Sequence, residues 1–345
     1  MKLSGNTPKV LTISIAAYNS EKYLSKCLDS FVIDEILDKL EVLIVDDGST
    51  DKTAEIAEGY VKAHPGTFKL ISKENGGHGS TINTGILNAS GKYFKVVDSD
   101  DWVEKDGIIR LIDYLENHDV DIAINTYYRI IDGNKVLFNT MSEDFQNYNQ
   151  IINFDEICDK FDIAMHAVTF KTQILKDLDI KIDEHCFYVD VEYTLYPIKN
   201  VNTAVVFDYP IYDYLLGRED QSMNIRNQHK RRNQHKRVCL SLLNYFNGIE
   251  NTINAEKSGF IKNRILKMIA NQYAIYFTMT PTKAIKEEIK NFEREFKNCN
   301  AELFDYLIGW GKNLGYIKLV RILRLTGYSG YIFILTMLKK LKVIQ

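Results

Sequence analysis

The sequence predicts an α/β protein in which a mostly parallel sheet has helices on both faces and a mainly helical region follows. Short apolar runs rich in β-branched residues alternate with amphipathic stretches through the first third of the chain. Such runs are typical of parallel strands buried on both sides. The alternation stops after Tyr127, and from about Arg226 the apolar spacing is helical. A chain of 345 residues fits two domains, which we place at residues 1–225 and 226–345.

Each expected element has a local reason. Apolar runs too short for helices predict strands at residues 10–16, 41–45, 68–72, 92–97 and 121–125. Amphipathic stretches that begin at capping residues such as Ser20 or Asp51 predict helices at residues 20–31, 51–61, 80–87 and 107–117. The pair Asp132-Gly133 between two apolar arms predicts a hairpin over residues 129–138. Residues 166–170 and 203–214 are expected to be extended.

Composition excludes several classes of protein. A hydrophobic fraction of 45% with 26% charged residues excludes a disordered or fibrous chain. The net charge of −3 lacks the basic excess of nucleic-acid-binding proteins, so no nucleic-acid partner is expected. The 5 cysteines are scattered and form no CxxC pair, which suits a reducing compartment rather than a disulfide or zinc framework. With neither a signal-like nor a membrane-spanning apolar run, the sequence predicts a cytoplasmic protein.

Polar, turn-forming groups follow four consecutive predicted strands. In an open parallel sheet the carboxyl ends of the strands meet at one edge, where ligands bind. Any one group could belong to an ordinary capped turn, but four together indicate a ligand site. The groups are Ala17-Tyr18-Asn19, Asp46-Asp47-Gly48-Ser49, Asn75-Gly76-Gly77-His78-Gly79 and Asp98-Ser99-Asp100-Asp101.

The last of these groups is the most informative. Three carboxylates within four residues repel one another unless a cation neutralises them, and oxygen ligands suit Mg²⁺ or Mn²⁺ shared with a diphosphate. The alternative is that one aspartate caps the next helix. Asp46 and Asp47 could likewise cap a helix or accept hydrogen bonds from a base or ribose. The glycines near Asn75 let backbone approach a ligand, but they form neither GxGxxG nor a phosphate-binding P-loop.

Over about residues 9–130 these motifs resemble, in order and spacing, glycosyltransferase family 2 with its nucleotide-sugar-binding GT-A fold. The resemblance implies an inverting enzyme that uses a UDP-sugar donor and Mn²⁺ or Mg²⁺. The motifs are Ser14-Ile-Ala-Ala-Tyr-Asn19, Val45-Asp-Asp-Gly-Ser-Thr-Asp51, Glu74-Asn-Gly-Gly77, Asn83-Thr-Gly85, Gly91-Lys-Tyr93 and Asp98-Ser-Asp-Asp-Trp102.

The resemblance also assigns roles to individual residues. The metal ligands would be Asp98, Asp100 and Asp101. The expected nucleotide-binding residues are Ala17, Tyr18, Asn19, Asp46, Asp47, Asn75, Gly77, Asn83, Asp98, Ser99, Arg218 and Ser222. Thr81-Ile82 departs from the family, which commonly has Ala-Arg there, so Arg218 is expected to approach the diphosphate instead; the alternative is a surface turn.

A general base is expected on a later acidic segment. The run Phe187-Tyr188-Val189-Asp190 resembles the acceptor-site signature of bacterial wall- and capsule-decorating members, so Asp190 is the predicted base. Glu192 and Glu184 are the next candidates, and an N-cap of a helix over residues 191–198 is the structural alternative for Asp190. The Gln-x-x-Arg-Trp motif of processive synthases is missing after Gln221, so a non-processive enzyme is expected.

Two basic segments lie in the C-terminal half. The hexapeptide of residues 226–231 repeats at 232–237, and we interpret it as a solvated helix face rather than a phosphate or lipid contact. From Leu307 to Gln345 there is no acidic residue, although Lys and Arg are interleaved with apolar residues. This pattern fits peripheral contact with anionic lipid, a helical cap on the catalytic domain, or a homo-oligomer interface.

The leading interpretation is a transferase that acts on a glycan, a lipid-linked glycan or a wall polymer. A sugar nucleotidyltransferase should carry a glycine-rich basic loop after its first strand, which Ala17-Tyr18-Asn19 is not. A degenerate sugar-nucleotide-binding scaffold is the non-enzymatic alternative, and the acidic cluster with Asp190 argues against it.

Overall fold

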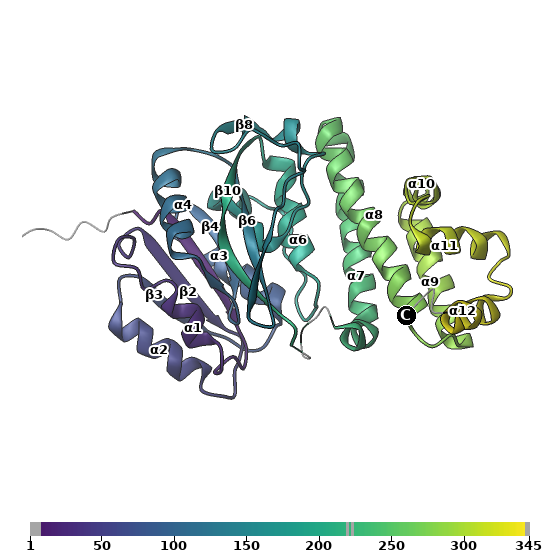
Figure 1. The fold of residues 1–345 in the computed structure, drawn as a ribbon, viewed down its shortest axis with the longest axis horizontal. Coiled ribbons are helices and arrows are strands. Elements are labelled where there is room, and N and C mark those ends of the chain that lie inside the picture. The colour runs from purple at the N-terminus through teal and green to yellow at the C-terminus, as the bar shows by residue number, and fades with distance from the viewer. Residues whose placement is uncertain (1–7, 219–220, 222–223, 342–345) are drawn as a thin grey trace, which may run out of the picture. The chain divides into compact units, whose positions relative to one another are not determined.

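The computed structural model describes residues 8–218, 221 and 224–341. It divides into two compact units, Met1–Arg218 and Glu219–Gln345, and each is described by itself. The first unit contains the sheet, and the described part of the second unit is helical (Figure 1).

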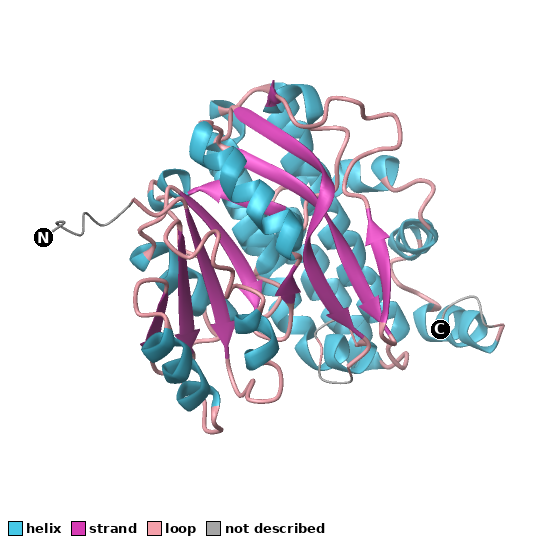
Figure 2. Cartoon of the chain, turned by 60° about the vertical axis from the view of Figure 1, so that its left-hand side comes forward, coloured by secondary structure: helices cyan, strands magenta, loops and turns pink. Residues whose placement is uncertain are grey.

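The strands of the first unit form one sheet (Figure 2). Among the described residues it has ten strands, in the order β3-β2-β1-β4-β9-β6-β10-β5, with β7 paired to β6 and β8 to β10. Adjacent strands β3, β2, β1 and β4 are parallel, as are β6 and β10. The strands are β1 (Leu11–Ala17), β2 (Leu40–Asp46), β3 (Phe68–Ser72), β4 (Tyr93–Asp98), β5 (Trp102–Val103), β6 (Ile122–Ile131), β7 (Asn134–Phe138), β8 (Ile151–Asn153), β9 (Val168–Lys171) and β10 (Thr203–Leu216).

The mostly parallel sheet is confirmed, and β9 overlaps a stretch that was expected to be extended. What local patterns did not predict is the place of β9 in the sheet. Strand β9 lies between β4 and β6 and is antiparallel to both, so β4 and β6 still point the same way. The predicted hairpin is also confirmed. Ile131 pairs with Asn134, and Asp132 and Gly133 between them have φ of 49° and 80°, the left-handed values that a two-residue type I′ turn requires.

Helices cover both faces of the sheet, because alternate residues of a buried strand point to opposite sides. Ile13 and Ile15 of β1 belong to the same core cluster as Leu111 and Leu115 of α4. On the other face α3 approaches β1 closely, since a Cβ at Gly85 would lie 2.0 Å from the Ser14 hydroxyl. The helices are α1 (Leu24–Asp29), α2 (Thr53–Ala63), α3 (His78–Asn88), α4 (Lys105–Asn117), α5 (Thr172–Lys176) and α6 (Asp190–Leu195).

The second unit packs amphipathic helices, and side chains cap the first turns of four of them. Asn224, Asn254, Thr282 and Asn300 each accept a hydrogen bond from a backbone N–H of the helix that follows. No helix in the described part of the chain is both long and apolar enough to cross a membrane. The helices are α7 (Ile225–Ile249), α8 (Ala255–Thr278), α9 (Lys283–Cys299), α10 (Ala301–Trp310), α11 (Gly315–Leu325) and α12 (Tyr331–Lys340).

The repeated hexapeptide lies in α7, but the prediction of a merely solvated face was wrong. His235 is buried, with Nδ1 2.7 Å from the Gln272 amide oxygen. Arg232 binds Glu288 of α9 through two nitrogens, at 2.7 and 2.9 Å. A side chain every three or four residues faces the neighbouring helices, so the second copy of the repeat contributes to the interior of the second unit.

Candidate active site

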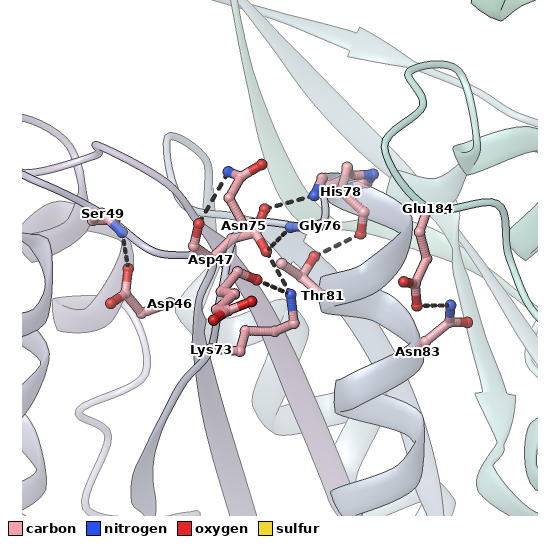
Figure 3. A network of polar contacts seen from close by, with 12 residues as sticks. Asp46, Asp47, Ser49, Lys73, Asn75, Gly76, His78, Thr81, Asn83 and Glu184 are labelled. Atoms are coloured by element: carbon pink, nitrogen blue, oxygen red, sulfur yellow. Dashed lines mark hydrogen bonds and ion pairs between the residues drawn. The ribbon is translucent and has the colours of Figure 1, made fainter.

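The carboxyl ends of β1, β2, β3 and β4 are joined by a chain of polar contacts. The Asn19 amide oxygen after β1 accepts a hydrogen bond from the Thr50 backbone N–H at 2.8 Å. Asp47 after β2 binds the loop after β3 (Figure 3). His78 from that loop reaches Asp98 at the end of β4, with Nε2 and Oδ1 3.0 Å apart. The four predicted strand ends therefore share one edge, where parallel sheets bind ligands.

The buried carboxylate of Asp47 holds the glycine loop. It accepts the backbone N–H of Gly76 at 2.9 Å and of Gly77 at 2.8 Å, and pairs with the Lys73 ammonium at 2.8 Å. The Asn75 amide donates to the Asp47 carbonyl at 3.0 Å (Figure 3). Asp47 thus fixes the shape of the loop, and a contact with a base or ribose stays a prediction.

The other predicted nucleotide-binding residues lie along the same edge. Ala17 is buried at the end of β1, and the Tyr18 side chain after it is 54% exposed. Asp46 accepts the Ser49 backbone N–H at 3.1 Å, which shapes the turn after β2. Ser99 is buried within the acidic motif. Ser222 lies outside the described residues.

Two residues of the acidic motif converge with a histidine that the sequence did not single out. Asp98, Asp101 and His166 each offer one ligand atom, and the three atoms lie within 4.8 Å of one another. Burial lowers the pKa of His166 to about 4, so its ring is neutral at physiological pH, as metal ligation requires. His166 comes from the segment just before β9, and no motif or spacing in that segment distinguishes it.

Asp101 is the buried member of the acidic motif. Its carboxylate accepts the Tyr212 hydroxyl at 2.6 Å and the Leu215 backbone N–H at 2.8 Å, so β10 holds it in place. Burial, together with the charges of Asp100 and Asp98, raises the pKa of Asp101 well above its usual range. The carboxylates therefore repel one another as the sequence suggested.

Asp100 faces a different group. Its carboxylate lies 2.7 Å from the Arg218 guanidinium, which stacks 4.6 Å above the Tyr23 ring. Ile82, where the resembled family commonly has arginine, is buried in α3. Arg218 therefore lies beside the acidic motif, where the sequence predicted a substitute cation.

The carboxylate of Asp190 influences the same histidine, His78, as the carboxylates of the acidic motif. Burial lowers the pKa of His78, but the carboxylates of Asp98, Asp190 and Asp100 outweigh it, and the net pKa of His78 is raised. These carboxylates thus lie close enough to influence a single ring. Helix α6 begins at Asp190 and its N-cap position is Val189, so Asp190 belongs to the first helical turn.

The two other candidate bases have structural partners. Glu192 is fully buried, and its carboxylate accepts the Asp183 backbone N–H at 2.8 Å. The carboxylate of Glu184 accepts the Asn83 amide at 3.2 Å (Figure 3). The charge of Asp190, in turn, contributes to raising the pKa of both His78 and Tyr214 beside the acidic motif.

The fold and the site define an α/β protein with acidic side chains at the carboxyl ends of its parallel strands. Comparison with known proteins then gives the family of its first half. The family model "Glycosyl transferase family 2" matches residues 12–179. The match assigns these residues, just under half of the chain, to a domain of that family.

Curated relatives agree with this assignment. Glycosyltransferase GlyA of Streptococcus pneumoniae is 39% identical over 118 residues, which are 34% of this chain and 17% of GlyA. Poly(ribitol-phosphate) beta-glucosyltransferase of Bacillus spizizenii is 27% identical over 302 residues, 86% of this chain and 44% of the relative. The chain thus spans less than half the length of these relatives.

Solved structures share the fold over nearly the whole chain. Residues 1–349 of Staphylococcus aureus TarS, solved in complex with UDP-GlcNAc, align with a TM-score of 0.62 at 18% identity, covering 92% of each chain. The similarity confirms the expected GT-A fold and the helical region that follows it.

Proposed function

We propose that the protein transfers a sugar from a UDP-sugar to a hydroxyl group of a glycan or cell-envelope polymer. The transfer is a single inverting, non-processive displacement that depends on Mn²⁺ or Mg²⁺. The observation that carries the proposal is the convergence of the acidic motif, Arg218 and Asp190 on one edge of the sheet. Two relatives support the substrate classes: TarS was solved with UDP-GlcNAc, and the Bacillus relative is named for poly(ribitol phosphate).

The residues at this edge fit a divalent cation. Two carboxylates and one imidazole present donor atoms within 4.8 Å of one another, a donor set that suits Mn²⁺. Asp98, Asp101 and His166 would hold the ion. Asp100 lies next to them in the motif and forms an ion pair with Arg218. Such a cation supplies neutralising charge for the diphosphate leaving group.

The chain's own groups complete the reaction. Asp190 accepts the proton of the acceptor hydroxyl while that oxygen forms the new bond to the sugar C1. The bond from C1 to the diphosphate oxygen breaks at the same time, and its electron pair leaves with UDP. Arg218 binds the diphosphate oxygens through its planar fork. A positioned base of this kind contributes about 10²–10⁴-fold to the rate.

The C-terminal helices support an acceptor held at the cytoplasmic face of a membrane. On α11, Lys318, Arg321, Ile322 and Leu325 recur every three or four residues and are exposed. On α12, Phe333, Met337 and Lys340 do the same, and Phe333 is 68% exposed. Apolar and basic side chains together on outward faces suit an anionic lipid surface, where each Lys or Arg gains about 1 kcal/mol.

A donor screen tests the proposal. Purified protein with Mn²⁺ is incubated with UDP-, GDP- and CDP-sugars and with short poly(ribitol phosphate), and the released nucleotide is measured. We expect UDP release that rises with acceptor, and tighter binding of UDP than of GDP or CDP by calorimetry. Tight UDP binding without any turnover would favour the scaffold alternative, whereas UDP-sugar synthesis from UTP and a sugar phosphate would favour a nucleotidyltransferase.

A further inference from the structure

The glycine-rich loop that opens α3 lies against the segment that precedes Asp190. A Cβ at Gly79 would lie 2.1 Å from the Asp183 carbonyl oxygen, and one at Gly77 would lie 3.3 Å from the His185 backbone. The His185 backbone N–H also donates to the Gly76 carbonyl. These glycines therefore make room for another part of the chain, where the sequence suggested a close approach of ligand.

Asn83, one turn further along α3, binds the same segment through both ends of its amide. Its nitrogen donates to the Ile182 carbonyl at 2.9 Å, and its oxygen accepts the Ile182 backbone N–H at 3.1 Å. The nitrogen also lies 3.2 Å from the Glu184 carboxylate (Figure 3). This pairing reproduces the two hydrogen bonds that a neighbouring strand would make to Ile182.

Glu192 holds the segment from the side of α6. Its buried carboxylate accepts the backbone N–H of Asp183, the residue after the one that Asn83 binds. Within the segment, His185 and Tyr188 have φ of 53° and 70°, left-handed values that cost energy in residues other than glycine. Such a conformation persists where surrounding contacts impose it.

We infer that Asn83 is a positioning residue for the acceptor-side segment, residues 182–189, and thereby for Asp190, rather than a ligand of the nucleotide. The inference rests on the proposed function in so far as Asp190 is the base. Asn83 and the glycines fix the segment on α3, Glu192 fixes it on α6, and Asp190 begins that helix. A shift of about 1 Å in a reacting group can cost roughly 10²-fold in rate.

Kinetics of Asn83→Ala test the inference, with Asn88→Ala as the matched control. Asn88 lies on the same helix, and its amide donates to the Thr84 carbonyl, one turn back. We expect Asn83→Ala to lower kcat at least tenfold with the Kd for UDP within twofold of wild type. Asn83→Asp, which can accept from Ile182 but not donate to it, should fall between the two. A loss of UDP affinity as large as the loss of kcat would overturn the inference and return Asn83 to the nucleotide.

Hydrogen exchange tests whether Asn83 and the glycines fix residues 182–189, independently of the role of Asp190. In Asn83→Ala the backbone amides of Ile182 and His185 should exchange at least tenfold faster, whatever the identity of the base. Gly79→Ala should have the same effect, whereas Gly59→Ala, a helical glycine with no heavy atom within 4 Å of the added Cβ, should not. Unchanged exchange in both Asn83→Ala and Gly79→Ala would refute the positioning role of Asn83. An active Asp190→Asn would refute only the proposed base.

Discussion

The guanidinium of Arg218 lies 2.7 Å from the carboxylate of Asp100, although the two residues are 118 positions apart in the chain. The ion pair brings the cation that follows β10 to the acidic motif that follows β4. A bound diphosphate offers Arg218 two anionic groups in place of one carboxylate. In the proposed function, the pair keeps this cation beside the acidic motif before the donor binds.

Replacement of Arg218 should weaken donor binding more than it affects the fold. Hydrogen bonds to charged groups contribute about 1.5–3 kcal/mol, so Arg218→Ala should raise the KM for the UDP-sugar roughly tenfold or more. Arg218→Lys keeps the charge but loses the fork and should be intermediate. Steady-state kinetics check this, with the exposed Lys62→Ala as control. An unchanged donor KM in Arg218→Ala would leave the residue with the surface-turn interpretation.

Removal of the metal should abolish transfer. We expect EDTA to stop UDP release and added Mn²⁺ or Mg²⁺ to restore it. Asp98→Asn and His166→Gln should each weaken Mn²⁺ binding roughly tenfold or more, because each removes one donor of the three-residue cluster. Titration calorimetry with Mn²⁺ measures this, and Asp106→Asn, an exposed aspartate of α4, is the control. Full turnover in the presence of chelator would remove the metal from the account.

The sequence predicted the strand ends well because their signals are local. Apolar runs predicted β1 to β4. Strands buried on both faces need apolar side chains throughout, and those of Ile13, Ile44 and Val97 are fully buried. The polar groups that follow these strands lie at one edge, since parallel strands bring their carboxyl ends together.

The missed features depend on contacts between distant segments. Strand β9 inserts antiparallel between β4 and β6, and His166 reaches the acidic motif with it; no local pattern encodes that pairing. The contacts of Gly79 and Asn83 involve residues about 100 positions away, so the sequence suggested a ligand beside the glycines and assigned Asn83 to the nucleotide. In α7, a repeated basic pattern did not reveal which copies face the neighbouring helices.

The second unit should lose stability in acid through His235. Burial lowers the pKa of His235 to about 4, whereas an unfolded chain has a histidine pKa of about 6.5. The native state therefore disfavours the proton, so its stability is full above about pH 6.5 and falls as the pH approaches 4. The difference corresponds to roughly 3 kcal/mol.

Denaturant unfolding of the full chain between pH 7 and pH 4.5 checks this expectation. His235→Gln removes the titrating group, so its stability should depend less steeply on pH than that of the wild type. Equal slopes in the two proteins would show that His235 is protonated as readily in the native state as in the unfolded chain.

The outward faces of α11 and α12 should bind anionic vesicles. We expect co-sedimentation with vesicles that contain phosphatidylglycerol and release at high salt, since salt screens surface charge. Phe333→Ser and Arg321→Glu should each reduce vesicle binding. Lys297→Glu makes the same charge change at an exposed residue of α9 and should have a smaller effect. Binding that ignores lipid charge and salt would favour a packing or oligomer role for this segment.

The most direct test of the central claim is the rate of sugar transfer by Asp190→Asn, measured with a UDP-sugar, Mn²⁺ and acceptor, beside Glu184→Gln. Asparagine keeps the shape of Asp190 but cannot accept the hydroxyl proton, whereas Glu184 lies on the same segment and is exposed. The account predicts a fall of about 10²–10⁴-fold for Asp190→Asn with nearly unchanged UDP affinity, and near-normal transfer by Glu184→Gln. Near-normal transfer by Asp190→Asn would contradict it.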